Sequence, residues 1–386
     1  MDGKRLIEKI RLRNILSFGD KGEEITLEPL NIIIGQNASG KSNLVDVIKL
    51  LRASTTSGGF SNQIVKGGGI GEWIWKGNKN DNMASISVSA GKLTYSEPNV
   101  TYKVIFEESY GGRFRIADEI ITENGKQYYL RENLVGENEN GEKKKLEKLS
   151  EQETIFSKME AVDFFGSGWD LSENISEIKF FTELNTNRTT DIRKPQIPDS
   201  PNNFLEEDAS NLALVLNDLE HRGDTKDKIV ENLKKFNPRI KDFSIRILGG
   251  TVQLFIREEG LEKPISAMRL SDGTLRYLCL LAILCHPEPP PLICIEEPET
   301  GLHPDILPTI AELMIEASQR TQLIATTHPD ILVSAFSEYP EAVLVCEKDE
   351  DGTHFKRLEK DKLKAWLEEY ELGDLWLKGE IGGKRW

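Results

Sequence analysis

The chain has 386 residues, and 49 lysines and arginines against 64 aspartates and glutamates give a formal net charge of −15. This balance excludes a basic protein that coats nucleic acid, and a hydrophobic content of 38% excludes a disordered chain. At roughly 150 residues per domain, the length allows two to three domain-sized units. The longest apolar stretch, 277–285, is far shorter than the ~20 residues of a membrane-spanning helix. Because residues 1–14 also lack a signal-peptide pattern, we expect a cytoplasmic protein without a membrane partner.

Neither the cysteines nor the histidines show the spacing of a metal site or a disulfide framework. The sequence has no C-x-x-C pair and no H-E-x-x-H pattern. We therefore expect no structural metal and no disulfide from Cys279, Cys285, Cys294, Cys346, His221, His286, His303, His328 and His354.

The first part of the chain predicts a strand, a loop and a helix, followed by a β-rich region. The apolar run 30–34 is typical of a buried strand, Gly35 ends it, and apolar residues recur at helical spacing from Lys41. Residues 84–131 alternate short β-rich runs with Gly-Gly and Asn-Gly turns, which predicts an antiparallel sheet. The highly charged stretch 136–150 predicts a loop or a short solvated helix, and we place a lobe boundary there.

The second part alternates helices and strands. The apolar positions predict helices over 205–240 and 277–284, and strands over 243–247, 252–256, 292–295 and 323–325. The helix 277–284 is apolar on all sides, as a buried helix is. This alternation favours a mostly parallel sheet with helices on both faces.

The sequence GQNASGKS matches G-x-x-x-x-G-K-[ST] and lies between a predicted strand and a predicted helix, the context that a P-loop requires. In such a loop, backbone N–H groups hold phosphates, the Lys41 ammonium reaches the β- and γ-phosphates, and the Ser42 hydroxyl binds Mg²⁺. A glycine-rich turn that only caps a helix is the alternative. The predicted nucleotide-binding residues are Gly35, Gln36, Asn37, Ala38, Ser39, Gly40, Lys41, Ser42 and Asn43.

Two carboxylates, Glu296 and Glu297, follow the predicted buried strand 292–295. Ligands of open α/β sheets bind at the C-terminal ends of the strands. One carboxylate can hold Mg²⁺, and its neighbour can orient or deprotonate an attacking water. An acidic loop without such a role is the alternative.

Two weaker motifs follow the same order along the chain. In LSDGT, Ser271 is placed to cap the buried helix, and in TTH, His328 follows the predicted strand 323–325. Each motif alone is common in proteins without this chemistry. Together with the P-loop and the two carboxylates, they indicate a nucleotide-hydrolysing site.

The order GQNASGKS, LSDGT, ICIEEPETGLHP and TTHPD resembles an ABC-type ATPase head of the SMC/RecF/OLD-like class, and closely the free-standing bacterial AAA-type ATPases related to OLD nucleases. RNILSF near the N-terminus is also similar to RecF-like heads. The resemblance implies an α/β P-loop NTPase: an ABC-type head with an antiparallel β-rich lobe and a mostly parallel sheet flanked by helices. It also implies ATP and Mg²⁺ as ligands, and two heads that sandwich two ATP molecules.

The same resemblance assigns roles to single residues. Ser271 and Gly273 would contact the γ-phosphate of the ATP bound to the other head. Glu297 would be the catalytic base and His328 the switch histidine. Lys41 would bind phosphate, and Ser42 and Glu296 would be the two metal ligands. Residues 301–303 would form the D-loop.

Three features depart from the family pattern. Glu296 stands where Walker B usually ends in Asp, and Asp272 stands where many ABC proteins have Gly. We expect the Asp272 carboxylate to be turned aside. The Q-loop glutamine is not assigned, with Gln63 and Gln152 as candidates.

The elements predict four segments: an ATPase lobe with the P-loop and the β-rich sheet (1–135), a charged loop and helical insert (136–260), the signature, Walker B and switch-histidine part (261–345), and a hairpin with a C-terminal tail (346–386). The predicted function is ATP binding and hydrolysis by a head that forms an ATP-dependent homodimer. The head would act on DNA or drive a separate effector protein such as a nuclease, in DNA repair or anti-phage defence.

Other classes stay open. An ABC transporter subunit would share most motifs, although the β-rich segment and EEPETGLHP are less typical of one. A P-loop small-molecule kinase would leave LSDGT and His328 unexplained. An OLD nuclease would carry a Toprim domain after His328, and the residues that follow it are too few.

Three segments bear on partners. Residues 222–246 hold a local excess of four positive charges, which fits either DNA or an ordinary solvated helix face. The acidic run 347–351 predicts a solvated hairpin loop instead of a metal site. In the tail, an apolar stripe at helical spacing either packs on this chain's own sheet or docks a second protein; its residues are Leu363, Trp366, Leu367, Tyr370, Leu375, Trp376 and Trp386.

Overall fold

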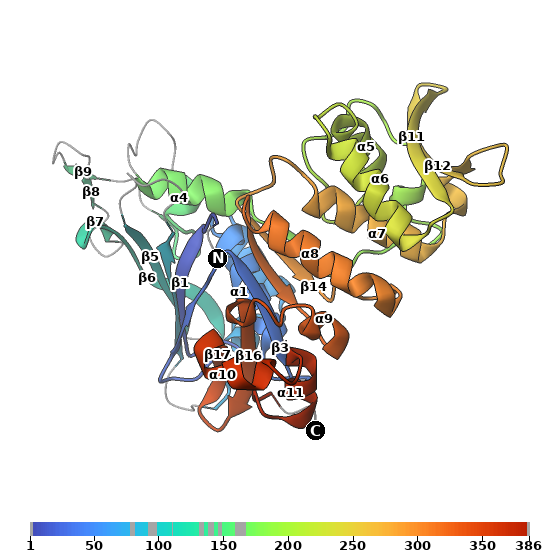
Figure 1. Ribbon diagram of the computed structural model, residues 1–386. Helices are drawn as coiled ribbons and strands as arrows, with labels where there is room; N and C mark the ends of the chain where they lie inside the picture. Colours follow the sequence, from blue (N-terminus) through green and yellow to red (C-terminus); the bar gives the residue numbers. More distant parts are fainter. Residues whose placement is uncertain are drawn as a thin grey trace.

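In the residues that the computed structural model describes, three sheets are surrounded by helices (Figure 1). The structure describes residues 3–77, 82–91, 99–109, 111–130, 135–137, 143–145, 149–158 and 167–383. In these ranges, no helix is long and apolar enough to cross a membrane.

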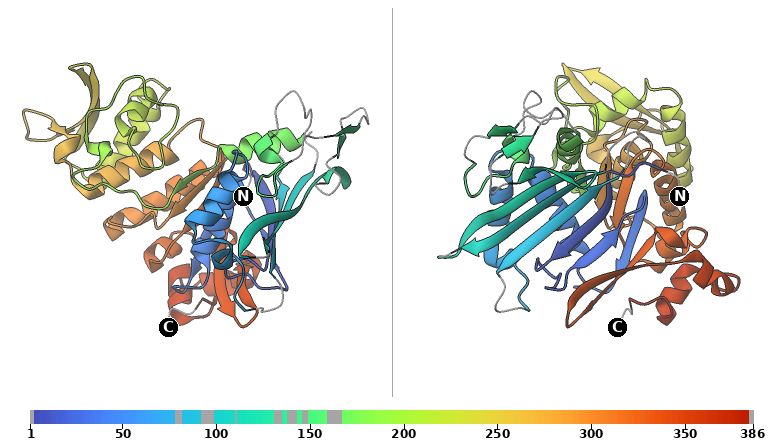
Figure 2. Two further views of the ribbon diagram at one scale, coloured as in Figure 1. Left: turned by 180° about the vertical axis from the view of Figure 1, so that it is seen from behind. Right: turned by 90° about the vertical axis from the view of Figure 1, so that its left-hand side faces the viewer.

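The N-terminal lobe is built on an eight-stranded sheet in the order β2-β1-β4-β5-β6-β7-β8-β9, in which each neighbouring pair is antiparallel. This sheet faces the viewer on the right of Figure 2. The antiparallel sheet predicted over 84–131 is confirmed. The strands are β1 (Ile7–Arg13), β2 (Glu23–Thr26), β4 (Met83–Ala90), β5 (Val100–Ser109), β6 (Arg113–Glu123), β7 (Lys126–Leu130), β8 (Val135–Glu137) and β9 (Lys143–Lys145).

The charged stretch 136–150 differs from its prediction as a loop or a short helix. β8 pairs with β7, and β9 pairs with β8, so part of this stretch extends the sheet. Strand pairing uses backbone hydrogen bonds, and charged side chains are common on edge strands. The composition therefore indicated solvent exposure without indicating the backbone conformation.

The central sheet has the order β10-β14-β15-β3-β16-β17, and its first five strands are parallel. The predicted mostly parallel sheet flanked by helices is confirmed. β17 pairs antiparallel with β16 and closes the predicted hairpin. The strands are β3 (Leu30–Gly35), β10 (Lys179–Phe181), β14 (Leu292–Glu296), β15 (Gln322–Thr326), β16 (Val343–Asp349) and β17 (Gly352–Arg357).

Both faces of the central sheet are covered, and so its strands are apolar without alternation. All six residues of β3 are buried. Ile33 packs in one core with the N-terminal lobe, and Ile32 and Ile34 pack in the other with the C-terminal helices. The N-terminal side carries α1 (Lys41–Ala53), α2 (Gly59–Lys66), α3 (Ile70–Trp73), the short 3₁₀ helix η2 (Phe156–Lys158) and α4 (Ser167–Ser176).

A helical lobe projects from the central sheet, at the upper right of Figure 1. It joins three helices to an antiparallel sheet in the order β11-β12-β13, which confirms the helices and strands predicted between 205 and 284. Its elements are α5 (Leu212–Leu219), α6 (Thr225–Phe236), β11 (Ile240–Leu248), β12 (Thr251–Glu258), β13 (Ile265–Ser266) and α7 (Asp272–Leu284).

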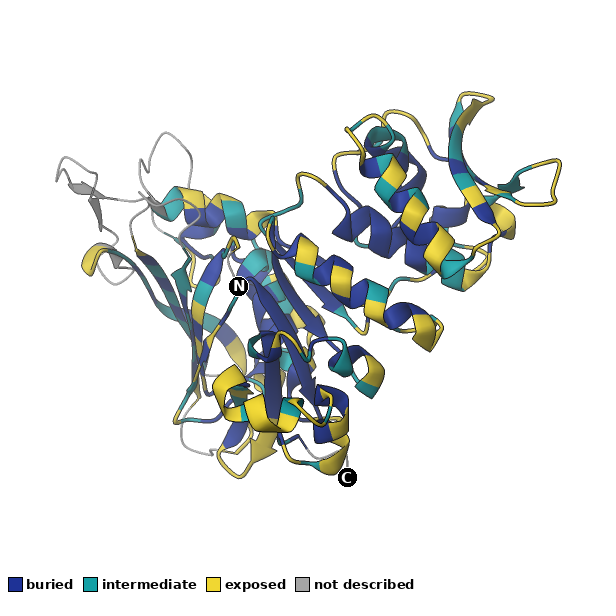
Figure 3. Ribbon diagram, viewed as in Figure 1, coloured by how far each residue is buried: buried dark blue, intermediate teal, exposed yellow. Residues whose placement is uncertain are grey.

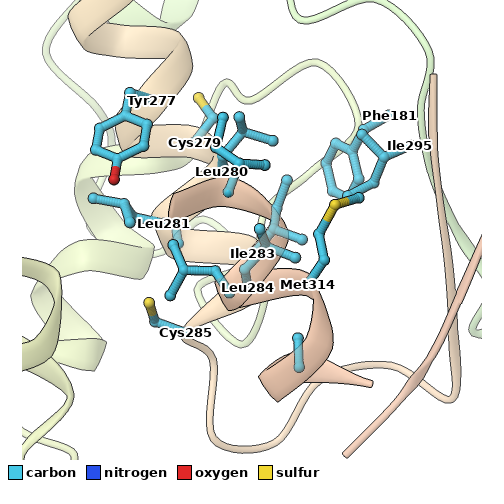
Figure 4. Packing of buried hydrophobic residues seen from close by; sticks show 14 of the residues in the cluster. Phe181, Tyr277, Cys279, Leu280, Leu281, Ile283, Leu284, Cys285, Ile295 and Met314 are labelled. Carbon is cyan, nitrogen blue, oxygen red and sulfur yellow. The ribbon is translucent and has the colours of Figure 1, made fainter. Parts of the chain in front are cut away.

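Helix α7 is apolar on all sides because other elements cover it. It packs against α5, α6 and α8 (Leu307–Ala317). Figure 4 shows Leu280 and Ile283 of α7 in one core with Met314 of α8 and with Phe181 and Ile295 of the central sheet. The core therefore joins the helical lobe to the sheet.

The C-terminal tail forms α10 (Lys360–Leu367) and α11 (Leu372–Lys378) (Figure 3). Residues of α11 are buried in the core, and Leu363, Leu367 and Tyr370 of the predicted stripe are partly buried against it. α11 packs against α9 (Asp330–Ser334), where a Cβ on Gly373 would lie 2.4 Å from the Asp330 carbonyl oxygen. Trp376 is 1% exposed, and its indole N–H donates to the Gly383 carbonyl oxygen at 3.0 Å. Of the two alternatives for the tail, the structure therefore supports packing on this chain for Trp376, and not the docking of a second protein there. Trp386 lies outside the described residues.

Candidate nucleotide-binding site

The P-loop joins β3 to α1 at the position predicted for it. Gly40 precedes α1 with a φ of +112°, and a Cβ on it would lie 2.3 Å from the Thr353 hydroxyl oxygen. Both the backbone angle and the space therefore require glycine. The Thr353 hydroxyl lies 2.7 Å from the Ser39 carbonyl oxygen, so β17 braces the loop from outside.

The ammonium of Lys41 lies inside the P-loop, where a phosphate would bind. Its ammonium donates to the carbonyl oxygens of Gly35 and Gln36, both at 2.8 Å. The residue is 6% exposed, and burial lowers the pKa of its ammonium. A buried cation gains from an anion beside it, so a bound phosphate would offset this cost.

One cavity of about 420 Å³ brings most of the predicted site residues together. Lys348 of β16 was not predicted, because it lies in a run that the sequence marks as an acidic hairpin. Gln36 and Ser39 line a neighbouring cavity of about 520 Å³ between the P-loop, β16 and the turn at Gly382. The first cavity is lined by Asn37, Ala38, Gly40, Lys41, Ser42, Asn43, Glu297, Thr326, His328 and Lys348.

The two predicted metal ligands, Ser42 and Glu296, lie in contact. Burial raises the pKa of the Glu296 carboxyl, and a hydrogen bond from the Ser42 hydroxyl opposes this rise. A partly desolvated carboxylate beside a hydroxyl is a donor set that suits Mg²⁺. Among the described residues, no group of three or more His, Cys, Asp and Glu could hold a metal ion.

Glu297 and His328 lie next to each other in the lining of this cavity. The Nε2 atom of His328 lies 3.6 Å from Glu297 Oε1. Glu297 has a φ of +47°, and its backbone N–H donates to the Thr326 carbonyl oxygen at 3.0 Å. The Thr300 hydroxyl donates to Glu297 Oε2 at 3.3 Å. The ends of β14 and β15 therefore hold the predicted base and the switch histidine in one place.

Glu299, which no sequence motif indicated, contacts the chain at Thr327 and His328. Its Oε1 accepts hydrogen bonds from the Thr327 hydroxyl at 2.9 Å and from the His328 backbone N–H at 3.1 Å. Burial raises the pKa of the Glu299 carboxyl. In the sequence, Glu299 is only the third glutamate of EEPET, and nothing in that run indicates a contact with residues 28 and 29 positions away.

The signature residues lie apart from this cavity. Ser271 caps α7 as predicted, and its hydroxyl accepts from the Thr274 N–H at 3.1 Å. Neither Ser271 nor Gly273 is among the residues that line the cavity of about 420 Å³. Asp272 pairs with Arg193, whose Nη2 lies 2.5 Å from Asp272 Oδ1. Arg193 was not singled out from the sequence.

A small cavity of about 190 Å³ lies where α7 meets the acidic strand end. Arg276, Glu296, Glu297 and Thr300 line it, together with 182–184 after β10. Neither Q-loop candidate lines any of these cavities: Gln63 lies on α2, and Gln152 donates to the Phe114 carbonyl oxygen at 3.3 Å.

The basic segment 222–246 is largely compensated by carboxylates. Five of its eight basic side chains form ion pairs, mostly with acids from outside the segment. The structure therefore favours the solvated helix face over the DNA surface for this segment. The paired residues are Arg222, Lys226, Lys228, Lys235 and Lys241.

Comparison with solved structures agrees with the fold. An Smc head bound to the C-winged helix domain of ScpA matches with a TM-score of 0.59 and 16% identity, over 92% of this chain and 99% of that one. A Pyrococcus furiosus Smc head with an extended coiled coil, bound to the C-terminal domain of ScpA, matches with a TM-score of 0.60 and 15% identity, over 94% and 99%. A Pyrococcus yayanosii Smc head with a coiled coil and joint matches with 0.53 and 13%, over 94% and 99%. A search of curated proteins found no match.

A comparison with protein families shows the family to which the chain belongs. The matching family model is described as "AAA domain, putative AbiEii toxin, Type IV TA system" and covers residues 30–334. This range contains the P-loop, the signature segment, both glutamates and His328. The ABC/SMC-type part of the resemblance is confirmed, and the closer relation to OLD nucleases stays a prediction. The chain belongs to this AAA-domain family and is a P-loop NTPase with an SMC-head-like α/β fold.

Proposed function

We propose that this protein is a Mg²⁺-dependent ATPase in which two copies close around ATP. The observation that carries the proposal is the placement of Glu297 and His328, 3.6 Å apart, in the same cavity as Lys41 and Ser42. A phosphate-binding loop and a base beside one cavity are the parts that hydrolysis of a terminal phosphate needs.

Different residues of the chain bind the phosphates, hold Mg²⁺ and activate the attacking water. The P-loop backbone and Lys41 bind the phosphates at the N-terminus of α1. Ser42 and Glu296 would hold Mg²⁺, which would neutralise charge on the phosphates. Glu297 accepts the proton of the attacking water, and His328 orients Glu297 and the γ-phosphate.

The dimer follows from the position of the signature residues. Ser271 and Gly273 offer N–H groups at the N-terminus of α7, yet they do not line the nucleotide cavity of their own chain. A second copy would bring them to the γ-phosphate. Whether the cycle drives DNA or a separate effector is a prediction from the resemblance alone.

Phosphate release by the purified protein tests hydrolysis. We expect steady release with ATP and Mg²⁺, none with EDTA, and none from Lys41→Ala. ADP formation without an equal amount of free phosphate would instead support the kinase alternative.

Light scattering of Glu297→Gln tests the dimer: we expect ATP to double the mass, and Ser271→Arg to abolish this change. Equal mass with and without ATP would contradict the closing step.

A further inference from the structure

The signature helix begins with a carboxylate that needs an explanation. Asp272 is the first residue of α7, between Ser271 and Gly273. An acidic residue at this position stabilises a helix through the helix dipole. The same charge would repel a phosphate that approaches the helix N-terminus. A functional signature therefore requires a group that fixes and neutralises Asp272.

Arg193 is that group. Its side chain is 4% exposed, and its Nη2 lies 2.5 Å from Asp272 Oδ1. Its other nitrogens donate to three backbone carbonyl oxygens: Nε to Thr186 at 2.7 Å, and Nη1 to Leu270 at 2.7 Å and Ala267 at 3.2 Å. One buried guanidinium thus holds both the carboxylate and the turn that leads into Ser271.

The segment that carries Arg193 is itself anchored. Arg193 ends the 3₁₀ helix η3 (Asp191–Arg193), which packs against η4 (Ala267–Arg269) just before the signature. Three residues on, Gln196 and Val252 of β12 exchange two backbone hydrogen bonds of 2.9 Å. The Gln196 side-chain oxygen also accepts from the Leu214 N–H at 3.1 Å. The guanidinium is therefore held in place before any partner arrives.

We propose that Arg193 is a positioning residue that makes LSDGT competent to bind the phosphate held by a second copy. It fixes the turn at 267–270, and it neutralises the charge of Asp272. The proposal rests on the proposed ATP-dependent dimer, and it places the effect of Arg193 on the partner's nucleotide and not on its own.

Mixed dimers separate these two possibilities. In a dimer of one Arg193→Gln chain and one Glu297→Gln chain, both defects fall on the same nucleotide if Arg193 acts across the interface. The other nucleotide then has a complete site. If Arg193 served its own nucleotide, each site would carry one defect.

The expected result is recovery on mixing. Each variant alone should lose at least tenfold in phosphate release while it still binds ATP. An equal mixture should regain about a quarter of the wild-type rate, since half of random dimers are mixed and each has one complete site. Lys194→Gln, an exposed neighbour that loses the same charge, should keep wild-type turnover. Arg193→Gln with Asp272→Asn should regain part of the loss, because the uncompensated carboxylate is gone.

The contradicting results are distinct. The pair Ser271→Ala with Glu297→Gln, in which no bulky side chain blocks closure of the dimer, reports on the trans signature alone. If that pair recovers on mixing and the Arg193→Gln pair does not, the inference on Arg193 is overturned while the dimer stands. If neither pair recovers on mixing, both the proposed dimer and the inference on Arg193 are contradicted. Should Arg193→Gln not fold, Arg193→Lys keeps the charge without reaching all four acceptors, and the same mixing test applies to it.

Discussion

Arg276 of the signature helix donates a hydrogen bond from Nη1 to the Thr300 carbonyl oxygen, 3.0 Å away. The Thr300 hydroxyl in turn donates to Glu297. Helix α7 serves the nucleotide of another copy in the proposed dimer, and Glu297 serves the nucleotide of its own chain. Arg276 therefore links helix α7 to Glu297 through Thr300.

Removal of this connection should slow hydrolysis without weakening ATP binding. In Arg276→Ala, the Thr300 backbone loses a charge-assisted hydrogen bond of about 1.5–3 kcal/mol, so Glu297 is held less firmly. We expect a roughly tenfold lower kcat with an unchanged Kd for ATP. Arg257→Ala, on the exposed face of β12, is the matched control. A kcat equal to the wild-type value would show that Thr300 does not transmit an effect to Glu297.

Glu299 should give the protein a pH-dependent stability. Burial raises its folded-state pKa above the unfolded value of about 4.3, so the folded state prefers the neutral carboxyl. Its contribution to stability is complete below the unfolded pKa and falls as pH rises through the folded pKa. Glu299→Gln cannot ionise, so its melting temperature should rise relative to wild type between pH 4 and pH 8. A constant difference across this range would argue against a buried, titrating Glu299.

A methyl group at Gly40 should disable the P-loop. The φ of +112° strains any L-residue, and the new Cβ would meet the Thr353 hydroxyl at 2.3 Å. We expect Gly40→Ala to lower ATP affinity by at least tenfold, measured by calorimetry. Gly71→Ala in α3 has no atom within 4 Å of its new Cβ and should bind as wild type does. Equal affinity in both variants would contradict the geometry described for the loop.

Trp376 should matter for stability. It is 1% exposed and packs in the core with α9, so Trp376→Ala should cost about 3–5 kcal/mol of unfolding free energy in urea. Trp366, which is 44% exposed on α10, is the matched control and should cost far less. Similar small losses in both variants would place Trp376 outside the core.

The four cysteines should be inert in the folded protein. All four are buried, and burial raises the pKa of Cys285 and Cys346 to about 11 and that of Cys279 and Cys294 further. Only the thiolate attacks a disulfide reagent. With a chromogenic disulfide at pH 8, we expect reaction only after unfolding. A thiol that reacts rapidly in the native protein would contradict this burial.

The features that the sequence predicted are those that depend on residues close together in the chain. GQNASGKS needs only its own neighbours to form a loop between β3 and α1, and Ser271 caps α7 through a contact three residues away. Arg193 and Glu299 act through partners tens of residues distant, so no local pattern could identify them. The same limit applies to the tail, where helical spacing marked Trp376 as apolar but could not say that α9 covers it.

The central claim is that Glu297 deprotonates the attacking water in a site whose nucleotide binding depends on other residues. Single-turnover hydrolysis by Glu297→Gln, with ATP bound at saturation and Mg²⁺ present, tests it directly. The amide keeps the size of the side chain but cannot accept the proton. We predict ATP affinity within about twofold of wild type and a hydrolysis rate lower by at least 10²-fold. Hydrolysis at the wild-type rate with ATP bound would contradict the assignment of Glu297 as the base.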